Sequence, residues 1–363
     1  MWVYLILMVA LVLLSCNKEK SIFKTTLSGI VLFLLIGLRG EYVGNDTINY
    51  IFFFNRMKWV TTIIDPTSRF EKGYQIYCKI IGLFFDYQIM FIITALICIG
   101  CILYGIVKNS KNWQYSLFLF VGLRFFYFFL SGIRQSIAVS LIFVAYIFLK
   151  QNKILKYVLL VILASTFHFS ALIFLLAWPL SKIKFTYKNI FKILSLTLVT
   201  YAFFNPILTV VLKYMPNYYS GYLITEAASA NNLANYIEMI IPILILLFAK
   251  FSGYLKEINV NNLDKEESII KENSNKNLEL FFLLISSALF FMATRVSVLD
   301  RIVQYYWIFS INTITNIIFS IKDLRKRLIW FLMISLLIII YNIMILILRP
   351  EWTQIIPYKF FWQ

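Results

Sequence analysis

Charged side chains are scarce in this 363-residue chain. Asp, Glu, Lys and Arg make up 14% of it, whereas 61% of the residues are hydrophobic and 18% are aromatic. This composition excludes a soluble domain. The 34 basic residues exceed the 17 acidic ones and give a net charge of +17, but a disordered or nucleic-acid-binding chain with that charge would be polar. We therefore predict no nucleic-acid partner.

The chain contains a single histidine, His168. One histidine without acidic or thiol neighbours cannot form a zinc site, and the sequence has no HExxH or DxD motif. Cys98 and Cys101 form a CxxC inside an apolar run, where metal or redox use is disfavoured. Walker, dinucleotide-binding and GxSxG motifs are also missing, which argues against nucleotide-dependent chemistry. The sequence thus predicts no metal and no cofactor.

Apolar runs recur along almost the whole chain, at about the 20 residues that one helix needs to cross a bilayer. They predict an all-α fold, a polytopic transmembrane helical bundle of about 10–12 spans. The bundle forms a single integral membrane domain over residues 1–363, with a polar cytoplasmic loop at 253–277. The predicted spans lie near residues 1–16, 22–38, 88–107, 114–130, 133–149, 189–212, 234–252, 279–294, 302–321 and 328–348.

Two stretches do not fit simple spans. Residues 155–180 are polar in the middle and have Lys clusters on both flanks, so we predict two short helices that meet near Phe167-His168. Residues 39–87 are too polar at first to span. They are predicted to form an outer loop whose segments 50–54 and 76–85 are interfacial or re-entrant helices.

Basic residues set the orientation and then divide by type. With both termini outside, the inner loops hold 21 of the 34 basic residues, nearly all of them Lys, as the positive-inside rule requires. Only two of the 10 arginines, Arg325 and Arg327, are among them. The others lie in the membrane or on its outer side: Arg39, Arg56, Arg69, Arg124, Arg134, Arg295, Arg301 and Arg349. Because the guanidinium fork suits phosphate and pyrophosphate, we predict an outward-facing anion site.

Two of these arginines stand out by position. Arg124 lies within an apolar run, where an unpaired charge costs at least ~2.5 kcal/mol, and the alternative to a functional role is an ion pair with Glu238 or Asp300. Arg134, followed by Gln135, lies close to the positive N-terminal end of a predicted helix. Backbone donors and the guanidinium would hold an anion there together.

Three side chains are candidates for a catalytic base. Asp46, in the outer loop, is our first choice, and the alternative is that it only caps the following helix. Glu71 is a second carboxylate from the same loop. His168 could act as a general base or donate a hydrogen bond to a phosphate, and the alternative is a buried histidine bonded to the backbone.

These residues fall into motifs that resemble the EpsG family of Wzy-like polysaccharide polymerases. The motifs are, in chain order, Gly44-Asn45-Asp46-Thr47-x-x-Tyr50 after Arg39, Glu71-x-Gly73, Gly132-x-Arg134-Gln135-x-Ile137-Ala138, Ala164-x-x-Phe167-His168-x-Ser170-Ala171, Arg301 with Tyr305, and Ile356-Pro357-Tyr358. The resemblance covers nearly the whole chain. Its Arg-Gln and Phe-His-x-Ser motifs are the most specific.

The resemblance implies a GT-C-like membrane glycosyltransferase that polymerises lipid-linked repeat units of an exopolysaccharide, capsule or O-antigen. Its partners would be undecaprenyl-pyrophosphate-linked glycans, membrane lipids, a flippase and a chain-length regulator. It would lie in the bacterial cytoplasmic (inner) membrane, multi-pass, with the active site facing outside. A flippase or transporter of the same glycans, a membrane O-acyltransferase and a polymer ligase stay open as alternatives.

The same hypothesis assigns roles to the candidate residues. The substrate and pyrophosphate site would comprise Arg39, Arg124, Arg134, Gln135, Ser170, Arg295, Arg301 and Tyr305. The guanidinium groups would neutralise the departing pyrophosphate. Asp46, His168 or Glu71 would take the proton of the acceptor hydroxyl.

Overall fold

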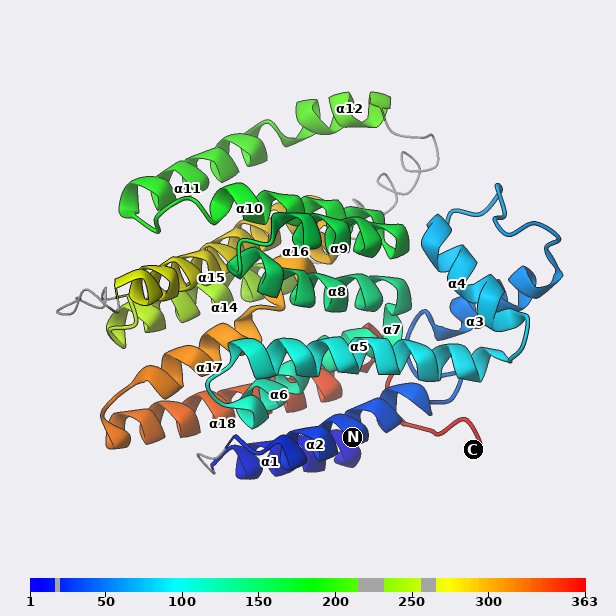
Figure 1. The fold of residues 1–363 in the computed structure, drawn as a ribbon, viewed down its shortest axis with the longest axis horizontal. Coiled ribbons are helices and arrows are strands. Elements are labelled where there is room, and N and C mark those ends of the chain that lie inside the picture. The colour runs from blue at the N-terminus through cyan, green and yellow to red at the C-terminus, as the bar shows by residue number, and fades with distance from the viewer. Residues whose placement is uncertain (17–19, 215–231, 256–265) are drawn as a thin grey trace. The chain divides into compact units, whose positions relative to one another are not determined.

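The computed structural model describes residues 1–16, 20–214, 232–255 and 266–363, and it gives the backbone alone for 211–214, 232–234 and 266–272. In these ranges every regular element is a helix, apart from one isolated antiparallel bridge between Arg39 and Phe360. The predicted all-α fold is confirmed (Figure 1). The chain divides into two compact units, Met1–Leu172 with Ile318–Gln363, and Ile173–Ile317. The single membrane domain over residues 1–363 stays a prediction.

The first unit is built from apolar helices with polar residues at several of their starts. Asn112 caps one helix by accepting the Tyr115 N–H, and Asp323 caps another by accepting the Arg325 N–H. These caps satisfy backbone donors that have no partner inside the helix. The helices are α1 (Trp2–Ser15), α2 (Ile22–Gly37), α3 (Thr47–Trp59), α4 (Lys72–Gly82), α5 (Tyr87–Asn109), α6 (Trp113–Gly122), α7 (Phe125–Ser131), α8 (Ile133–Lys150), α9 (Ile154–Phe167), α18 (Leu324–Leu348) and the short η3 (Pro350–Trp352).

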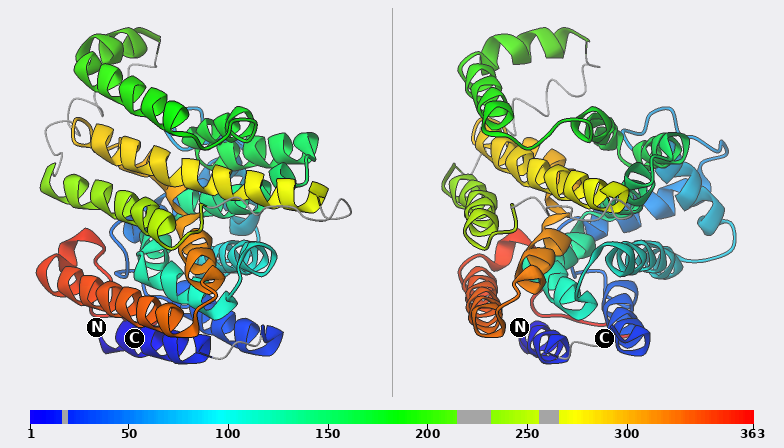
Figure 2. Two further views of the ribbon diagram at one scale, coloured as in Figure 1. Left: turned by 90° about the vertical axis from the view of Figure 1, so that its left-hand side faces the viewer. Right: turned by 60° about the vertical axis from the view of Figure 1, so that its left-hand side comes forward.

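Several helices of this unit pack side by side. α2 packs on α5, α5 on α8 and α8 on α9 (Figure 1). α18, from the far end of the sequence, lies beside α1 (Figure 2). Glycines allow close approach: a Cβ on Gly29 would lie 2.4 Å from Leu103, and one on Gly105 would lie 2.3 Å from Phe143. Small residues at helix contacts are typical of packing in membranes.

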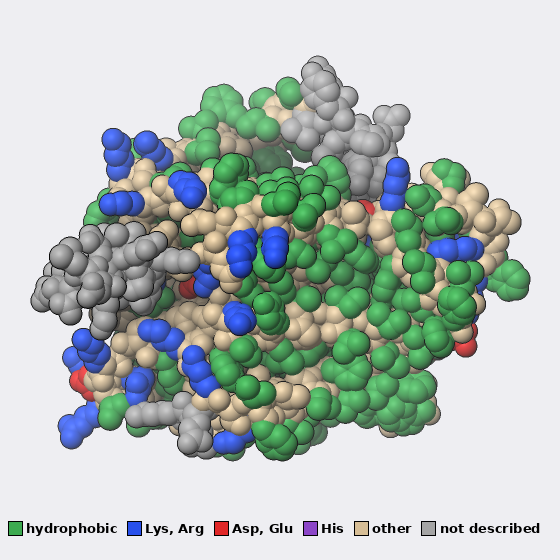
Figure 3. Space-filling model, in the orientation of Figure 1, with side chains coloured by type: hydrophobic (Ala, Val, Ile, Leu, Met, Phe, Trp, Pro, Cys, Tyr) green, Lys and Arg blue, Asp and Glu red, His purple; other side chains and the backbone are tan. Residues whose placement is uncertain are grey.

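Several helices have the length and composition of membrane spans. Within the described ranges, four are long and apolar enough to cross a bilayer: α5, α8, α18 and residues Asn273–Ala293 of α15 (Glu266–Ala293). The bent pairs α6–α7 and α11 (Tyr187–Ala202) with Phe204–Val210 raise the number to six if each is one span, and α1, α2, α9 and Phe169–Leu180 are shorter apolar helices. Hydrophobic side chains cover much of the visible face in Figure 3. The chain is a multi-pass membrane protein, and the figure of about 10–12 spans stays a prediction.

Three predicted helices are interrupted, and the prediction of continuous helices there was wrong. The helix over 114–130 bends by 57° because Arg124 adopts the left-handed conformation (φ 71°), through which a right-handed helix cannot continue. The helix over 189–212 bends by 75° between α11 and α12 (Phe204–Tyr214). The helix over 302–321 divides into α16 (Leu299–Trp307) and α17 (Ser310–Ser320). Hydropathy measures the length of a run but not the backbone conformation of one residue in it.

The pair of short helices predicted within residues 155–180 is confirmed. α9 ends at Phe167, and His168 is extended (φ −152°, ψ 110°). The 3₁₀ helix η1 (Phe169–Leu176) and the short α10 (Ala177–Leu180) follow. The chain therefore turns at the Phe-His-x-Ser motif.

The outer loop also contains two helices, α3 and α4, which are longer than the segments predicted at 50–54 and 76–85. Tyr50 and Phe54 of α3 share one hydrophobic cluster with Tyr74 and Cys78 of α4. Phe91 of α5 belongs to the same cluster. This packing holds α4 against α3 and α5. The interfacial position of α3 and α4 stays a prediction.

The second unit contains η1 in part, α10, α11, α12, α14 (Asn232–Phe251), α15, α16 and most of α17. α14 packs along α15, and α15 packs on α16. The Phe309 ring lies 5.5 Å from that of Phe174 and 4.8 Å from that of Phe282. α15 begins at Glu266, so part of the predicted loop 253–277 is helical, and residues 256–265 lie outside the described ranges.

Candidate active site

The Arg-Gln motif and the Glu-x-Gly motif meet at an ion pair. Arg134, in the first turn of α8, donates from Nη1 to Oε2 of Glu71, which precedes the first residue of α4. Their side chains are only 15% and 16% exposed. The Arg134 Cζ lies 4.2 Å from the centre of the Phe70 ring. A cation in the first turn opposes the helix dipole, and the Glu71 carboxylate offsets both that repulsion and the desolvation of the guanidinium.

Glu71 also reaches the Phe-His-x-Ser motif. Its Oε1 accepts the backbone N–H of Phe169 at 3.2 Å. In the same turn, His168 Nδ1 lies 2.8 Å from the Ser170 hydroxyl, which orients the imidazole. Three segments far apart in sequence thus bring Glu71, Arg134, His168 and Ser170 together.

A glycine makes this meeting possible. A Cβ on Gly73 would lie 2.3 Å from Oγ1 of Thr166 and 2.7 Å from the Thr166 carbonyl oxygen. Any larger side chain would push the first turn of α4 away from the end of α9. The Glu-x-Gly spacing therefore couples the carboxylate to the close approach that places it.

A further polar side chain lies beside the guanidinium of Arg134. Tyr50, which is 5% exposed, lies beside it and within electrostatic reach. Gln135 follows it in α8 and is also buried. The site combines one desolvated cation, one carboxylate and polar neighbours at a helix start, an arrangement suited to holding an anion.

Asp46 occupies the N-cap position of α3, but its carboxylate makes no capping hydrogen bond within the described part of the chain. The alternative that Asp46 caps α3 through its side chain was therefore wrong. The residues around it fix the loop instead. Asn45 Nδ2 donates to the Trp352 carbonyl at 2.9 Å, and Thr47 Oγ1 donates to the Val43 carbonyl at 2.6 Å. Gly44 takes a φ of +100°, which favours glycine.

Arg39 lies beneath this loop and is fully buried. Its Nη1 donates to the Ile36 carbonyl at 2.6 Å, and its Cζ lies 4.2 Å from the centre of the Phe91 ring. Its Nε and Nη2 have no acceptor among the residues that the structure describes. Burial lowers the pKa of Arg39 to about 10. The side chain is thus held by aromatic and backbone contacts.

Arg124 stands at the break between α6 and α7. Its Cζ lies 5.4 Å from the centre of the Trp352 ring, and Arg349 approaches the same ring at 5.7 Å. Cation–π contacts of this kind stabilise an arginine where it is partly desolvated. The alternative partners Glu238 and Asp300 belong to the second unit, so pairing with them stays a prediction.

Arg295, Arg301 and Tyr305 lie in the second unit. The Cζ of Arg295 lies 4.4 Å from the centre of the Tyr201 ring. Arg301 is exposed in the first turn of α16, and Tyr305 is fully buried one turn later. Their roles in a site shared with Arg134 stay predictions.

Some contributing residues were not among the sequence candidates. The Phe70 ring packs on the Arg134 guanidinium, and Thr166 lies against Gly73 at the start of α4. Trp352 contacts Arg124 through its ring and accepts a hydrogen bond from Asn45 through its carbonyl. Phe70 and Thr166 each lie within two residues of a motif residue, which is a usable signal. Trp352 follows the last span and has no such signal. No group of three or more His, Cys, Asp or Glu side chains that could hold a metal occurs within the described ranges.

A family model described as the EpsG family matches residues 22–360. A search of curated proteins and a search of solved structures gave no match. The matched range contains every candidate residue named above and nearly the whole chain. A match of this extent shows the family and, in broad terms, an exopolysaccharide-related, polymerase-like role. The chain therefore belongs to the EpsG family.

Proposed function

We propose that the protein is a membrane glycosyltransferase that polymerises oligosaccharide repeat units carried on undecaprenyl pyrophosphate. It acts on the outer face of the bacterial cytoplasmic membrane and extends an exopolysaccharide, capsule or O-antigen chain. A flippase supplies the substrate and a chain-length regulator acts on the product. The predicted topology supports this orientation, because the starts of α4 and α8 both lie on the outer side in it.

The observation that carries the proposal is the environment of Arg134. One donor of its guanidinium pairs with Glu71, while its Nε is buried with no acceptor among the described residues. A guanidinium with an unused donor, placed at a helix start, supports binding of a phosphate oxygen. Glu71 shares the guanidinium with the incoming pyrophosphate, so the cation is kept in place between turnovers.

The transfer step needs one stabilised leaving group and one base. The acceptor hydroxyl oxygen attacks the anomeric carbon of the donor sugar, and the bond from that carbon to the pyrophosphate oxygen breaks. Arg134 stabilises the negative charge that develops on the pyrophosphate. The hydroxyl proton passes to Asp46, which makes no capping bond, or to His168, which Ser170 orients. Glu71 is committed to Arg134 and suits a positioning role.

An elongation assay tests the proposal. Purified protein in vesicles containing the lipid-linked repeat unit should lose elongation by about 100-fold or more when Arg134→Gln removes the cation. Arg56→Gln is the matched control, because Arg56 pairs with Asp65 in the outer loop and does not contact the candidate site. The control should elongate normally. Product length on gels is the measurement.

Export of the unpolymerised unit in cells separates a polymerase from a transporter. Arg134→Gln should leave export intact, since the proposal gives this residue no part in crossing the membrane. Wild-type elongation by Arg134→Gln, or loss of export with elongation retained, would overturn the polymerase assignment. Membrane levels of both variants are compared so that a folding defect is recognised.

A further inference from the structure

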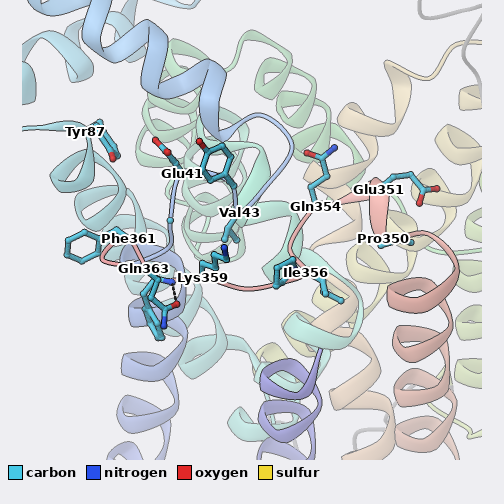
Figure 4. A pocket seen from close by; sticks show the side chains of 14 residues that line it. Glu41, Val43, Tyr87, Pro350, Glu351, Gln354, Ile356, Lys359, Phe361 and Gln363 are labelled. Carbon is cyan, nitrogen blue, oxygen red and sulfur yellow. Dashed lines mark hydrogen bonds between the residues drawn. The ribbon is translucent and has the colours of Figure 1, made fainter.

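The first unit contains a cavity of about 560 Å³, and neither Glu71 nor Arg134 lines it. Residues 40–43 of the outer loop and Tyr87 form one wall, and residues 350–363 form the other. Figure 4 shows Glu41, Val43 and Tyr87 on one side, with Lys359, Phe361 and Gln363 facing them across the opening. Its volume lies in the range of sites for small molecules.

Backbone hydrogen bonds hold these walls in a fixed relation. The Gly40 N–H donates to the Lys359 carbonyl at 2.8 Å, and the Gly44 N–H donates to the Gln354 carbonyl at 3.0 Å. A Cβ on Gly40 would lie 3.2 Å from the Phe360 carbonyl oxygen, so glycine permits the close approach. The cavity is therefore preformed, which lowers the entropic cost of binding a ligand.

The lining chemistry indicates which ligand class fits. Glu41 and Glu351 provide two carboxylates, Lys359 provides one ammonium, and Arg349 pairs with Glu351 at 3.6 Å. These charges balance, so the cavity has no excess of positive charge that would favour a pyrophosphate. Carboxylates, the Gln354 amide and the ammonium together can accept and donate hydrogen bonds to many hydroxyl groups.

Exposed aromatic rings complete the lining. Tyr42 is 71% exposed and Phe361 is 48% exposed. The neighbouring Glu41 carboxylate raises the pKa of the Tyr42 phenol, so a carboxylate and an aromatic ring lie close together in the lining. Rings beside hydroxyl-binding groups match the alternating apolar and polar faces of a sugar.

We infer that this cavity is a subsite for the oligosaccharide portion of the substrate, recognised by its hydroxyl groups and sugar faces, and separate from the pyrophosphate site at Arg134. The inference rests on the proposed function for its ligand. The Gly44-Asn45-Asp46 loop connects the cavity to the pyrophosphate site. It leads from the cavity wall directly into α3, whose Tyr50 lies beside Arg134. A glycan held in the cavity is thus placed along the same outer loop as the candidate base Asp46.

Binding of free oligosaccharide tests the inference. The probe is the repeat-unit oligosaccharide released from its lipid by mild acid, titrated into full-length protein in nanodiscs and followed by calorimetry. Tyr42→Ala and Glu41→Gln should each raise Kd by about tenfold, which corresponds to losing one ring contact or one charge-assisted hydrogen bond. Phe52→Ala is the matched control, because Phe52 is 73% exposed on α3 and does not line the cavity. It should bind normally.

Arg134→Gln distinguishes this inference from the proposed function. It should abolish elongation but leave the Kd for the free oligosaccharide within about twofold of wild type, since the binding contacts are elsewhere. No binding by the wild type, or unchanged binding by Tyr42→Ala and Glu41→Gln, overturns the subsite even if Arg134→Gln blocks elongation. Normal elongation by Arg134→Gln overturns the polymerase assignment while the binding result stands.

Discussion

The Glu71–Arg134 pair places two charges where both are largely removed from solvent. Each side chain retains about one sixth of its exposure, so removing either partner leaves the other with an uncompensated desolvation penalty. Glu71 has a second bond to the Phe169 N–H, which ties the pair to the turn that carries His168. At the scale of single residues, charge balance and geometry at this site are therefore maintained by the same carboxylate.

Glu71→Gln and Arg134→Gln should each destabilise the protein, by up to about 3 kcal/mol, and the double variant should lose less than the sum of the two. The reason is that the double variant leaves no unpaired charge. Thermal unfolding in detergent measures the shift for all four proteins of the cycle. Strict additivity would show that the two side chains do not interact in the folded protein.

The sequence identified the members of this cluster but not their pairing. Glu71, Arg134, His168 and Ser170 were candidates because they lie in motifs at predicted helix starts and turns. The contact between Glu71 and Arg134 joins positions 63 residues apart, and only packing determines it. Arg39 shows the opposite outcome, because its charge suggested an accessible anion ligand and the fold buries it completely.

At the scale of helices, short polar segments and single glycines decide how the apolar helices meet. Hydropathy located the runs that became α5, α8 and α18, since bilayer thickness sets their length. It did not locate the bend at Arg124, because one left-handed residue leaves the hydropathy of the run unchanged. It also did not reveal that residues 38–44 and 354–361 pair along their backbones, since such pairing requires no side-chain pattern.

Gly73→Ala tests the contact between α4 and α9. The added Cβ would meet Thr166 at 2.3 Å, so the variant should lose roughly 1–3 kcal/mol of stability and most of its elongation activity. Gly100→Ala is the matched control, because a Cβ there meets nothing within 4 Å. It should be neutral or slightly stabilising in thermal unfolding, as expected for alanine in a helix interior. Equal effects of the two variants would exclude the close approach as the cause.

Asp65 gives the α3–α4 connection a dependence on pH. Hydrogen bonds from the side chain and backbone of Thr67 lower the pKa of Asp65, and Arg56, at 2.5 Å, adds to this. A lowered pKa in the folded state means that the stabilisation is present above the unfolded value of about 3.9 and is lost as the pH falls through the folded value. Residues 60–68 should thus keep their order from neutral pH to about pH 4 and loosen only below it.

Hydrogen exchange, corrected for its intrinsic pH dependence, measures this effect. Asp65→Asn should show fast exchange in residues 60–68 already at pH 7. Asp86→Asn serves as the control, because Asp86 pairs with Lys58 but its side chain is 84% exposed, and an exposed pair contributes little. Protection that falls gradually between pH 7 and 5 in the wild type would contradict the role given to Asp65.

At the scale of the whole molecule, orientation decides which chemistry the site can reach. The lysine distribution predicts that residues 150–156 and 182–192 lie inside and that the outer loop and the C-terminal segment lie outside. Length and hydropathy could predict the multi-pass architecture, because bilayer thickness sets the length of the apolar runs. They could not predict the division into two units, because packing between helices is not encoded in their hydropathy.

Cysteine accessibility tests the orientation. In a Cys16→Ser background, Gln363→Cys should react with an impermeant maleimide added outside, and Lys153→Cys should react only after permeabilisation. Both positions are exposed in the structure, so burial does not prevent labelling. External labelling at Lys153, or protection at Gln363, would reverse the proposed side of the active site.

The pairing of residues 38–44 with the C-terminal segment also sets an order of biogenesis. The Tyr358 hydroxyl donates to the Leu35 carbonyl across 323 positions of sequence, and Gly40 and Gly44 find their acceptors in the same late segment. In the predicted topology, the outer loop is exported during translation long before these partners exist. In that topology, the loop that carries Asp46 takes its final form only after α18 has been inserted and the segment beyond it has crossed the membrane. A chain whose insertion stalls before α18 therefore leaves this loop and the cavity wall unassembled.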